Sequence, residues 1–589
     1  MIPVTFDGVM AKIHPARGDH TSGLGVVIVP PHGVEALAAT KSLRLLADAL
    51  AAKGHACLRL DLPGTGDSLG TDADADRIEA WTRSIVSAAQ VLSTHTGVTG
   101  TVVLGLRLGA LLAARAAPDI DNLAGLVLLD PITRGRTYAR ELTVTARAVA
   151  EGARLDPDAT STPAGVLIGG LLTSTATLEA LRGLDIAKLP EPAAPVLVLH
   201  RKGAQDAAPL ATAWPASPVI REEASGLDGI ALSPTMAVTP RAAFDRAVAW
   251  IDGLSKRGTV PAVAPAPAML TGPDFVEEAA TFGPDRRLFG VICQPTASEA
   301  TGPILLILNA GRNSHVGWAR TGVTIARRLA AQGIASFRMD LGGVGDGAER
   351  PGTADTIDAV LYNPALTPEV EAAVDLLDAG GYRSIAVMGA CSGAHLALQA
   401  AAADARIGGV VLVNIQRFVW RRGETVEQAI ASSYAVASSY VSKLWDRRAW
   451  TKVLTGERPL LPLALELTKR LAARARGFIP SPETRAARAL MDKLHRQDVP
   501  VEIVFSEDDA GLEELARHFG SRGRWLTRMP RVRLNYIANT DHDLTPEAAR
   551  DALFVHTLAA AGTWKTSPAG QVRPAEQRHG FCLALRQPQ

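Results

Sequence analysis

A cysteine between two glycines is the residue best suited to covalent chemistry. It lies in the run Gly389-Ala390-Cys391-Ser392-Gly393, after an apolar run and before a helical pattern. A sharp turn from a strand into a helix exposes the residue at its centre, and small neighbours permit the close backbone approach. A thiol at a helix N-terminus also loses its proton more readily. The run therefore predicts a nucleophile at Cys391, with Ser392 as the alternative.

Two later segments supply the partners that a thiol nucleophile needs. The apolar run 499–506 is followed by Asp508 and Asp509, and a further apolar run leads into His542. We expect His542 to take the proton of Cys391 and to protonate the leaving group, while a carboxylate orients the imidazole. These motifs resemble those of α/β-hydrolases, and the usual spacing in that family favours Asp509 as this carboxylate over Asp508, which stays open as the alternative.

Backbone amides close to the nucleophile are expected to stabilise an oxyanion. The candidates are the N–H of Ser392 and an N–H from the loop that contains Gly311 and Arg312. Gly389 and Gly393 are the small residues that the turn requires. No motif indicates a metal, a nucleotide or a flavin, so we expect neither a metal site nor a cofactor.

The elements that must position these residues occur twice in the chain. The residues around Asp61 recur around Asp340, and those around Arg107 recur around Cys391. Both copies alternate short β-branched or Leu-rich runs with amphipathic stretches, which is typical of a mostly parallel sheet covered by helices. The sequence therefore predicts an α/β protein with two tandem domains.

Length and composition suggest where these domains begin and end. The chain has 589 residues, too many for one ordinary domain. The predicted domains are 1–255 and 271–564, joined by a Pro/Ala-rich linker over 256–270, and a loosely structured tail is expected over 565–589.

A segment of the second domain, about 415–497, is predicted to form a helical lid. Residues 417–476 contain 12 Lys and Arg but five Asp and Glu. This excess would suit an anionic substrate such as an acyl-CoA or a carrier-bound acyl group, although a solvated helix face explains it equally well. Trp420 either lines a substrate pocket or packs between lid helices. The net charge of the whole chain is +1, which gives no reason to expect nucleic acid as a partner.

The first copy has the glycine spacing without the nucleophile. Its run is Gly105-Leu106-Arg107-Leu108-Gly109, and an arginine that stays protonated cannot attack a carbonyl. The acid and the histidine are also missing, so domain 1–255 is predicted to be non-catalytic. Arg107 is either a retained structural residue or a binding site for an anion.

These motifs resemble two related groups of α/β-hydrolases. The C-terminal half, with its Cys391 turn, resembles the type 1 hydrolases associated with exosortase A systems. The N-terminal half, with the Arg107 turn and the run that starts at Asp130, resembles the companion type 2. The resemblance implies two tandem α/β-hydrolase domains with helical lid insertions and a link to bacterial exopolysaccharide production. Ser392 stands where type 1 would carry an acidic residue.

The expected function is cysteine-dependent hydrolysis or acyl transfer on an ester or thioester, with a small-molecule or carrier-bound acyl substrate. A non-catalytic binding or scaffold protein and an aminopeptidase-like hydrolase are the alternatives. The N-terminus has no signal-peptide pattern, no run of about 18 apolar residues occurs, and the four cysteines lack CxxC spacing. We therefore expect a cytoplasmic protein without a transmembrane segment. The sequence gives no indication of its oligomeric state.

Overall fold

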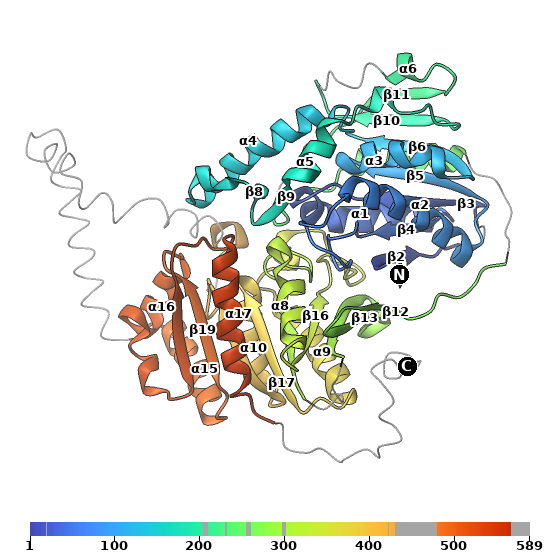
Figure 1. Ribbon diagram of the computed structural model, residues 1–589. Helices are drawn as coiled ribbons and strands as arrows, with labels where there is room; N and C mark the ends of the chain where they lie inside the picture. Colours follow the sequence, from blue (N-terminus) through green and yellow to red (C-terminus); the bar gives the residue numbers. More distant parts are fainter. Residues whose placement is uncertain are drawn as a thin grey trace, which may run out of the picture.

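The computed structural model shows two sheet-bearing units, one in each half of the chain (Figure 1). The strand order is β1-β2-β4-β3-β5-β6-β10-β11 in the first sheet and β12-β13-β14-β16-β15-β17-β18-β19-β20 in the second. Each sheet starts with antiparallel pairs and continues with parallel strands. The described residues are 1–18, 21–203, 210–229, 233–254, 261–296, 302–421, 423–429 and 480–566.

The first unit has a central sheet, a small second sheet and helices on both faces of the central sheet. The central strands are β1 (Ile2–Phe6), β2 (Val9–His14), β3 (Leu24–Val29), β4 (Ala56–Leu60), β5 (Gly100–Leu106), β6 (Leu123–Leu129), β10 (Val196–His200) and β11 (Val219–Glu223). The small sheet contains β7 (Ser161–Thr162), β8 (Gly165–Ile168) and β9 (Leu171–Ser174). The helices are α1 (Val34–Ala52), α2 (Arg77–Thr96), α3 (Leu108–Ala116), α4 (Gly135–Ala153), α5 (Thr175–Arg182), α6 (Leu210–Ala213) and α7 (Arg241–Gly253).

The second unit repeats this plan. Its strands are β12 (Ala268–Thr271), β13 (Phe275–Phe282), β14 (Leu288–Pro295), β15 (Pro303–Ile307), β16 (Ala335–Asp340), β17 (Ser384–Ala390), β18 (Ile407–Val413), β19 (Val501–Ser506) and β20 (Val532–Ile537). Its helices are α8 (Thr321–Ala330), α9 (Thr367–Ala379), α10 (Ser392–Ala403), α15 (Pro482–Arg496), α16 (Gly511–Phe519) and α17 (Glu547–Ala561).

Burial on both faces explains why the central strands are continuous apolar runs. All residues of β3 and β18 are buried. In the first unit α2 and α3 pack on one face of the sheet, and α1 and α7 pack on the other. In the second unit α9, α10 and α15 cover one face, and α8 and α17 cover the other. The two faces of each sheet therefore have separate cores, as the sequence pattern predicts.

The predicted linker and lid need correction at their ends. Residues 268–270 belong to β12, which pairs with β13, so the sheet of the second unit begins inside the predicted linker 256–270. Helix α15 lies within the predicted lid range, yet Ala487, Met491 and Leu494 pack into the core under the sheet. It is a covering helix because its apolar face is buried. Most of the lid (430–479) and of the tail (567–589) falls outside the described residues.

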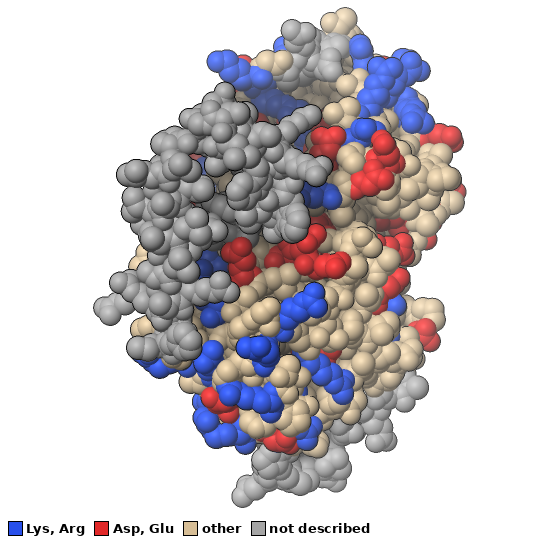
Figure 2. All heavy atoms as spheres, turned by 90° about the vertical axis from the view of Figure 1, so that its left-hand side faces the viewer, with Lys and Arg blue, Asp and Glu red and all other residues tan. Residues whose placement is uncertain are grey.

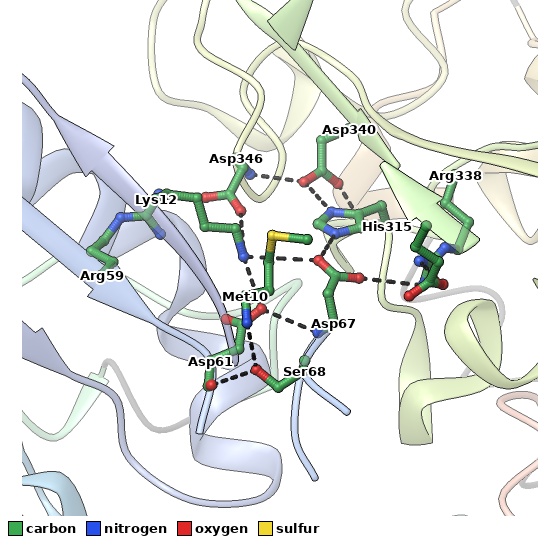
Figure 3. A network of polar contacts seen from close by, with 12 residues as sticks. Met10, Lys12, Arg59, Asp61, Asp67, Ser68, His315, Arg338, Asp340 and Asp346 are labelled. Carbon is green, nitrogen blue, oxygen red and sulfur yellow. Dashed lines mark hydrogen bonds and ion pairs between the residues drawn. The ribbon is translucent and has the colours of Figure 1, made fainter. Parts of the chain in front are cut away.

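The two units meet along their antiparallel edges. Met10 of β2 is buried together with Ala268 and Leu270 of β12 and with Phe289 of β14. Charged pairs lie beside this apolar contact (Figure 3). None of the helices in the described ranges is both long enough and apolar enough to cross a membrane.

The charged contacts of this interface are reciprocal. Arg59 of β4 lies 2.6 Å from Asp346 of the second unit. Arg338 of β16, the counterpart of Arg59, lies 3.3 Å from Asp67, the counterpart of Asp346. Such an exchange, in which residue i contacts j and j contacts i, is typical of a twofold-symmetric interface between identical subunits. The units are therefore packed as a pseudo-symmetric pair within one chain.

Candidate active site

Cys391 occupies a strained turn between β17 and α10. Its φ is 54° and its ψ is −118°, a conformation that non-glycine residues adopt only where the surrounding structure enforces it. A Cβ on Gly389 would lie 2.1 Å from the carbonyl oxygen of Gly393, and a Cβ on Gly393 would lie 2.1 Å from that of Asn309. Both positions therefore require glycine, as the sequence pattern predicts.

The turn presents the Cys391 thiol to a histidine and an aspartate from two other loops. Nδ1 of His542 lies 2.6 Å from Oδ2 of Asp509, and the Cys391 thiol lies close enough to the His542 ring to shift its pKa. Asp509 is buried, whereas Asp508 is exposed. The structure thus brings together Cys391, His542 and Asp509, and it places Asp509 rather than Asp508 against the imidazole.

The charges around His542 favour its protonated form. Burial alone would lower the pKa of this imidazole, but Cys391 and Asp509 together raise it well above its ordinary value. A thiol that gives its proton to such an imidazole becomes a nucleophilic thiolate. The side chain of His542 is 39% exposed, so one edge of the ring remains accessible.

Two residues that the sequence analysis did not single out hold the aspartate. Oδ1 of Asp509 accepts hydrogen bonds from Nε2 of Gln416 at 2.6 Å and from the amide of Gly511 at 2.7 Å. Oδ2 is left to the histidine. These two donors hold the Asp509 side chain in one orientation.

Asn414 connects the end of β19 to the loop that carries His542. Its Nδ2 donates to Oγ of Ser506 at 2.9 Å and to the carbonyl of His542 at 2.7 Å. Its Oδ1 accepts from the amide of Ser506 at 2.7 Å. Asn414 and Gln416 directly follow β18, the neighbour of the strand that carries Cys391. Their place at the carboxyl end of a central strand was the available sequence signal, because ligand sites in such sheets collect there.

An aromatic residue completes the surroundings of the thiol. The phenol of Tyr362 lies beside the Cys391 thiol and interacts with it electrostatically. Burial, and then the neighbouring Cys391, raise the pKa of Tyr362 well above its ordinary value, so the phenol stays protonated. Its ring stacks on Trp420 at 4.6 Å between centroids and meets His395 edge-on at 5.4 Å. Trp420 therefore packs on the tyrosine beside the thiol.

The predicted oxyanion donors differ in their availability. Ser392 is the first residue of α10, so its amide has no carbonyl partner within the helix. The amide of Gly311 donates to Oγ of Ser392 at 3.1 Å, so this donor is already occupied. The Arg312 side chain is paired with Asp355 at 3.0 Å. Ser392 is buried and bonded to the loop, which disfavours it as the alternative nucleophile.

The first unit has a turn of the same backbone conformation, with Arg107 in place of the cysteine. Arg107 has φ 54° and ψ −117° between β5 and α3. Its guanidinium contacts Glu35 at 2.9 Å, Asp130 at 3.5 Å and Glu141 at a shorter distance. Burial would lower the pKa of Arg107, but these carboxylates raise it. Because three carboxylates already neutralise this cation, the structure favours Arg107 as a retained structural residue over the alternative of an anion site.

The described residues contain a group with metal-ligand chemistry away from Cys391. It consists of His315, Asp340 and Asp346 at the interface between the units. Lys12 lies 3.6 Å from Asp346, and His315 lies 2.7 Å from Asp340. Cations of the protein already neutralise these carboxylates, so the group does not argue for a metal.

Comparisons with known proteins agree with the fold. Residues 26–157 match the family described as serine aminopeptidase, S33. No curated protein sequence matches the chain. Among solved structures, Est1E from Butyrivibrio proteoclasticus is 15% identical, with 43% of this chain and 98% of Est1E covered and a TM-score of 0.32. A cold-adapted esterase from an Arctic intertidal metagenomic library is 17% identical, with 50% and 97% covered and a TM-score of 0.30.

A third similar structure is a proline iminopeptidase-related protein from Thermus thermophilus. It is 16% identical, with 49% of this chain and 99% of that chain covered and a TM-score of 0.29. The S33 match covers Arg107 and no part of the Cys391 turn. The strand order of both sheets and this family match together show that the chain has the α/β-hydrolase fold, with two sheet-bearing units in tandem.

Proposed function

We propose that this protein is a cysteine-dependent hydrolase or acyltransferase that acts on an ester or thioester through an acyl-enzyme at Cys391. The observation that carries the proposal is the strained turn that holds Cys391 against the His542–Asp509 pair, whose Nδ1–Oδ2 distance is 2.6 Å. A weak nucleophile is activated when a base lies beside it and a carboxylate orients that base.

Acylation begins when Sγ of Cys391 attacks the carbonyl carbon and its proton passes to His542. The carbonyl oxygen becomes an oxyanion, which the amide of Ser392 stabilises. The intermediate then collapses, the bond to the leaving oxygen or sulfur breaks, and His542 returns the proton to the leaving group. Asp509 stabilises the imidazolium during these steps.

Deacylation uses the same histidine as a base. The thiol carries no negative charge once it is acylated, so one of the two charges that raise the pKa of His542 is lost. The imidazole then takes a proton from water or from an alcohol, which attacks the thioester carbonyl and releases Cys391. Water gives hydrolysis and an alcohol gives acyl transfer, so both reactions belong to the proposal.

The substrate class follows from the nucleophile more than from surface charge. On the face shown in Figure 2, acidic side chains gather near the middle and basic side chains toward both ends. Among the described residues, this face thus carries both signs of charge. The link to exopolysaccharide production, and with it an acylated saccharide as substrate or acceptor, rests on the resemblance of the Cys391 and Arg107 turns.

Intact-protein mass spectrometry after brief exposure to short and medium acyl-CoA thioesters and an acid quench tests the proposal. We expect the wild type to gain the acyl mass and Cys391→Ala to gain none. Cys293→Ala is the matched control, because Cys293 is also a free cysteine but lies buried in β14. An increment that persists in Cys391→Ala, or the absence of both an adduct and thiol release in the wild type, would reject the acyl-enzyme. Binding without a covalent adduct would favour the scaffold alternative.

A further inference from the structure

The loop between β15 and α8, residues 308–320, borders the Cys391 turn and is held by one carboxylate. Asp340 at the end of β16 accepts Nδ2 of Asn309 at 2.8 Å and the amide of His315 at 2.6 Å. Nδ1 of His315 lies 2.7 Å from the other oxygen of Asp340. The 308–320 loop, which includes Gly311, is thus tied to Asp340 at two of its residues.

The first unit reaches the same histidine. Nε2 of His315 lies 2.7 Å from Oδ2 of Asp67, and both side chains are buried (Figure 3). Burial would lower the pKa of His315, but Asp67 and Asp340 raise it to about 10. The ring is therefore an imidazolium at neutral pH and donates to both carboxylates. Asp67 is held in turn by Arg338 at 3.3 Å.

Three further residues of the 308–320 loop, Gly311, Trp318 and Arg320, lie against the first unit. Arg320 donates to the carbonyls of Gly64 at 2.9 Å and Gly66 at 2.8 Å. A Cβ on Gly311 would lie 3.0 Å from Oγ1 of Thr235. A Cβ on Gly169, in the turn between β8 and β9, would lie 2.5 Å from the ring of Trp318. The first unit therefore borders this loop along most of its length.

The equivalent loop of the first unit shows that this arrangement is asymmetric. Between β3 and α1 it consists of residues 30–33 alone. Asp61, the counterpart of Asp340, is bonded instead to Lys12 at 2.8 Å, and Lys12 lies on β2. Only the unit with Cys391 has its loop connected to the opposite unit by a histidine, while the arginine–aspartate pairs are reciprocal.

We propose that the non-catalytic first unit positions the 308–320 loop through the Asp67–His315–Asp340 contacts, so that the loop and the Ser392 amide beside it fit the oxyanion formed at Cys391. Asp67 and His315 are positioning residues in this proposal, because they act through the loop. The catalytic consequence rests on the proposed acyl-enzyme, whereas the positioning of the loop does not.

Two reactions of Cys391 separate positioning from thiol activation. Acylation by p-nitrophenyl acetate forms an oxyanion, whereas alkylation by iodoacetamide displaces iodide from a methylene carbon and forms none. We expect Asp67→Asn to slow acylation by about 100-fold, as misplacement by about 1 Å does. Alkylation of Cys391, followed by peptide mass spectrometry, is expected to stay within about twofold of the wild-type rate, because loop placement affects only a step that forms an oxyanion.

Asp346→Asn is the matched control, because it breaks the reciprocal pair with Arg59 and leaves Asp67 and His315 in contact. It is expected to change acylation by less than about threefold, because the Asp346 side chain is hydrogen-bonded to Arg59 and not to the 308–320 loop. His315→Gln is the second variant if Asp67→Asn does not fold, and the same selective loss is expected. Equal loss of acylation and alkylation in the Asp67 and His315 variants, or equal effects of Asp67→Asn and Asp346→Asn, would overturn the proposal.

Hydrogen–deuterium exchange of the peptide 308–316 tests the positioning without any substrate. We expect exchange in Asp67→Asn to be at least about tenfold faster than in the wild type and in Asp346→Asn, because local opening of the loop becomes easier. Unchanged exchange would contradict the positioning. A wild type that shows this exchange pattern but no acylation would reject the proposed function and leave the positioning supported.

Discussion

Each unit contains a turn with the same backbone conformation, but the residue at the centre of the turn differs chemically between the two units. Arg107 and Cys391 have the same φ of 54° and ψ values within one degree, −117° and −118°. Both turns have glycines whose absent side chains allow the strand and the helix to touch. The strained turn therefore belongs to the fold and persists without a nucleophile, so glycine spacing alone does not identify an enzyme.

The surroundings of the turn mark the difference. Cys391 faces the imidazole of His542, which favours the protonated form, and the phenol of Tyr362, which stays protonated. Arg107 faces Glu35, Asp130 and Glu141, which fix a permanent charge. The surroundings of Cys391 suit the nucleophile that we propose, whereas those of Arg107 hold a fixed charge.

Removal of the thiol should give the largest effect. We expect Cys391→Ala to lower kcat/KM for p-nitrophenyl acetate by at least about 10⁴-fold, since loss of a nucleophile removes the covalent route. The same position in the first unit provides the comparison, and Arg107→Lys should change kcat/KM by less than about threefold, because that side chain is remote from Cys391. An Arg107→Lys variant as inactive as Cys391→Ala would show that the units do not divide their roles in this way.

The contribution of His315 to stability should depend on pH. The pKa of His315 is raised from 6.5 to about 10 in the folded chain, so its stabilising contribution is complete below pH 6.5 and is lost as pH rises toward 10. One proton corresponds to a slope of about 1.4 kcal/mol per pH unit between these values. Urea unfolding of the wild type and of His315→Gln at several pH values measures this slope. If the free energy of unfolding depended on pH in the same way in both proteins, the raised pKa of His315 would be contradicted.

Stability should also distinguish the two turns. We expect Arg107→Ala to lower the free energy of unfolding by about 3 kcal/mol, because it leaves the largely buried Glu35 carboxylate without its cation. Cys391→Ala should change this free energy by less than about 1 kcal/mol, since it keeps the strained backbone and removes one sulfur atom. Denaturant titrations of both variants provide the measurement, and equal losses would indicate that Arg107 has no special structural role.

The smallest effect on kcat/KM is expected when Asn414 and its equivalent in the first unit, Asp130, are each replaced by the residue found in the other unit. Asn414 and Asp130 follow the equivalent strands β18 and β6 with similar φ values of 46° and 43°. Asn414→Asp should lower kcat/KM by about tenfold, because a carboxylate cannot donate to Ser506 and to the carbonyl of His542. The reverse change, Asp130→Asn, should leave kcat/KM unaltered. Full activity of Asn414→Asp would mean that other contacts position the histidine.

Much of the fold and the central triad of residues could be predicted from local sequence. The α/β class follows from apolar runs that alternate with amphipathic segments, and the Cys391 turn follows from spacing within five residues. Asp509 and His542 were found because each lies in the turn after a predicted strand. These signals are local, so a single sequence contains them.

Contacts between distant segments could not be predicted in this way. Gln416 and Asp509 are 93 positions apart, and Asp67 and His315 are 248 positions apart, so no spacing rule connects them. The occupied amide of Gly311 was missed for the same reason, because Ser392 bonds to it across the sheet. The three carboxylates around Arg107 could not be predicted either, because they come from separate elements.

The reciprocal pairs Arg59–Asp346 and Arg338–Asp67 bear on how this division of labour arose. In a homodimer encoded once, a change from cysteine to arginine would alter both subunits and remove every active site. Covalent fusion of the pair allows each position to mutate alone, so one copy can lose its chemistry and accumulate contacts that serve the other. The fusion also fixes the ratio of supporting to catalytic unit at one to one in every molecule, independent of protein concentration.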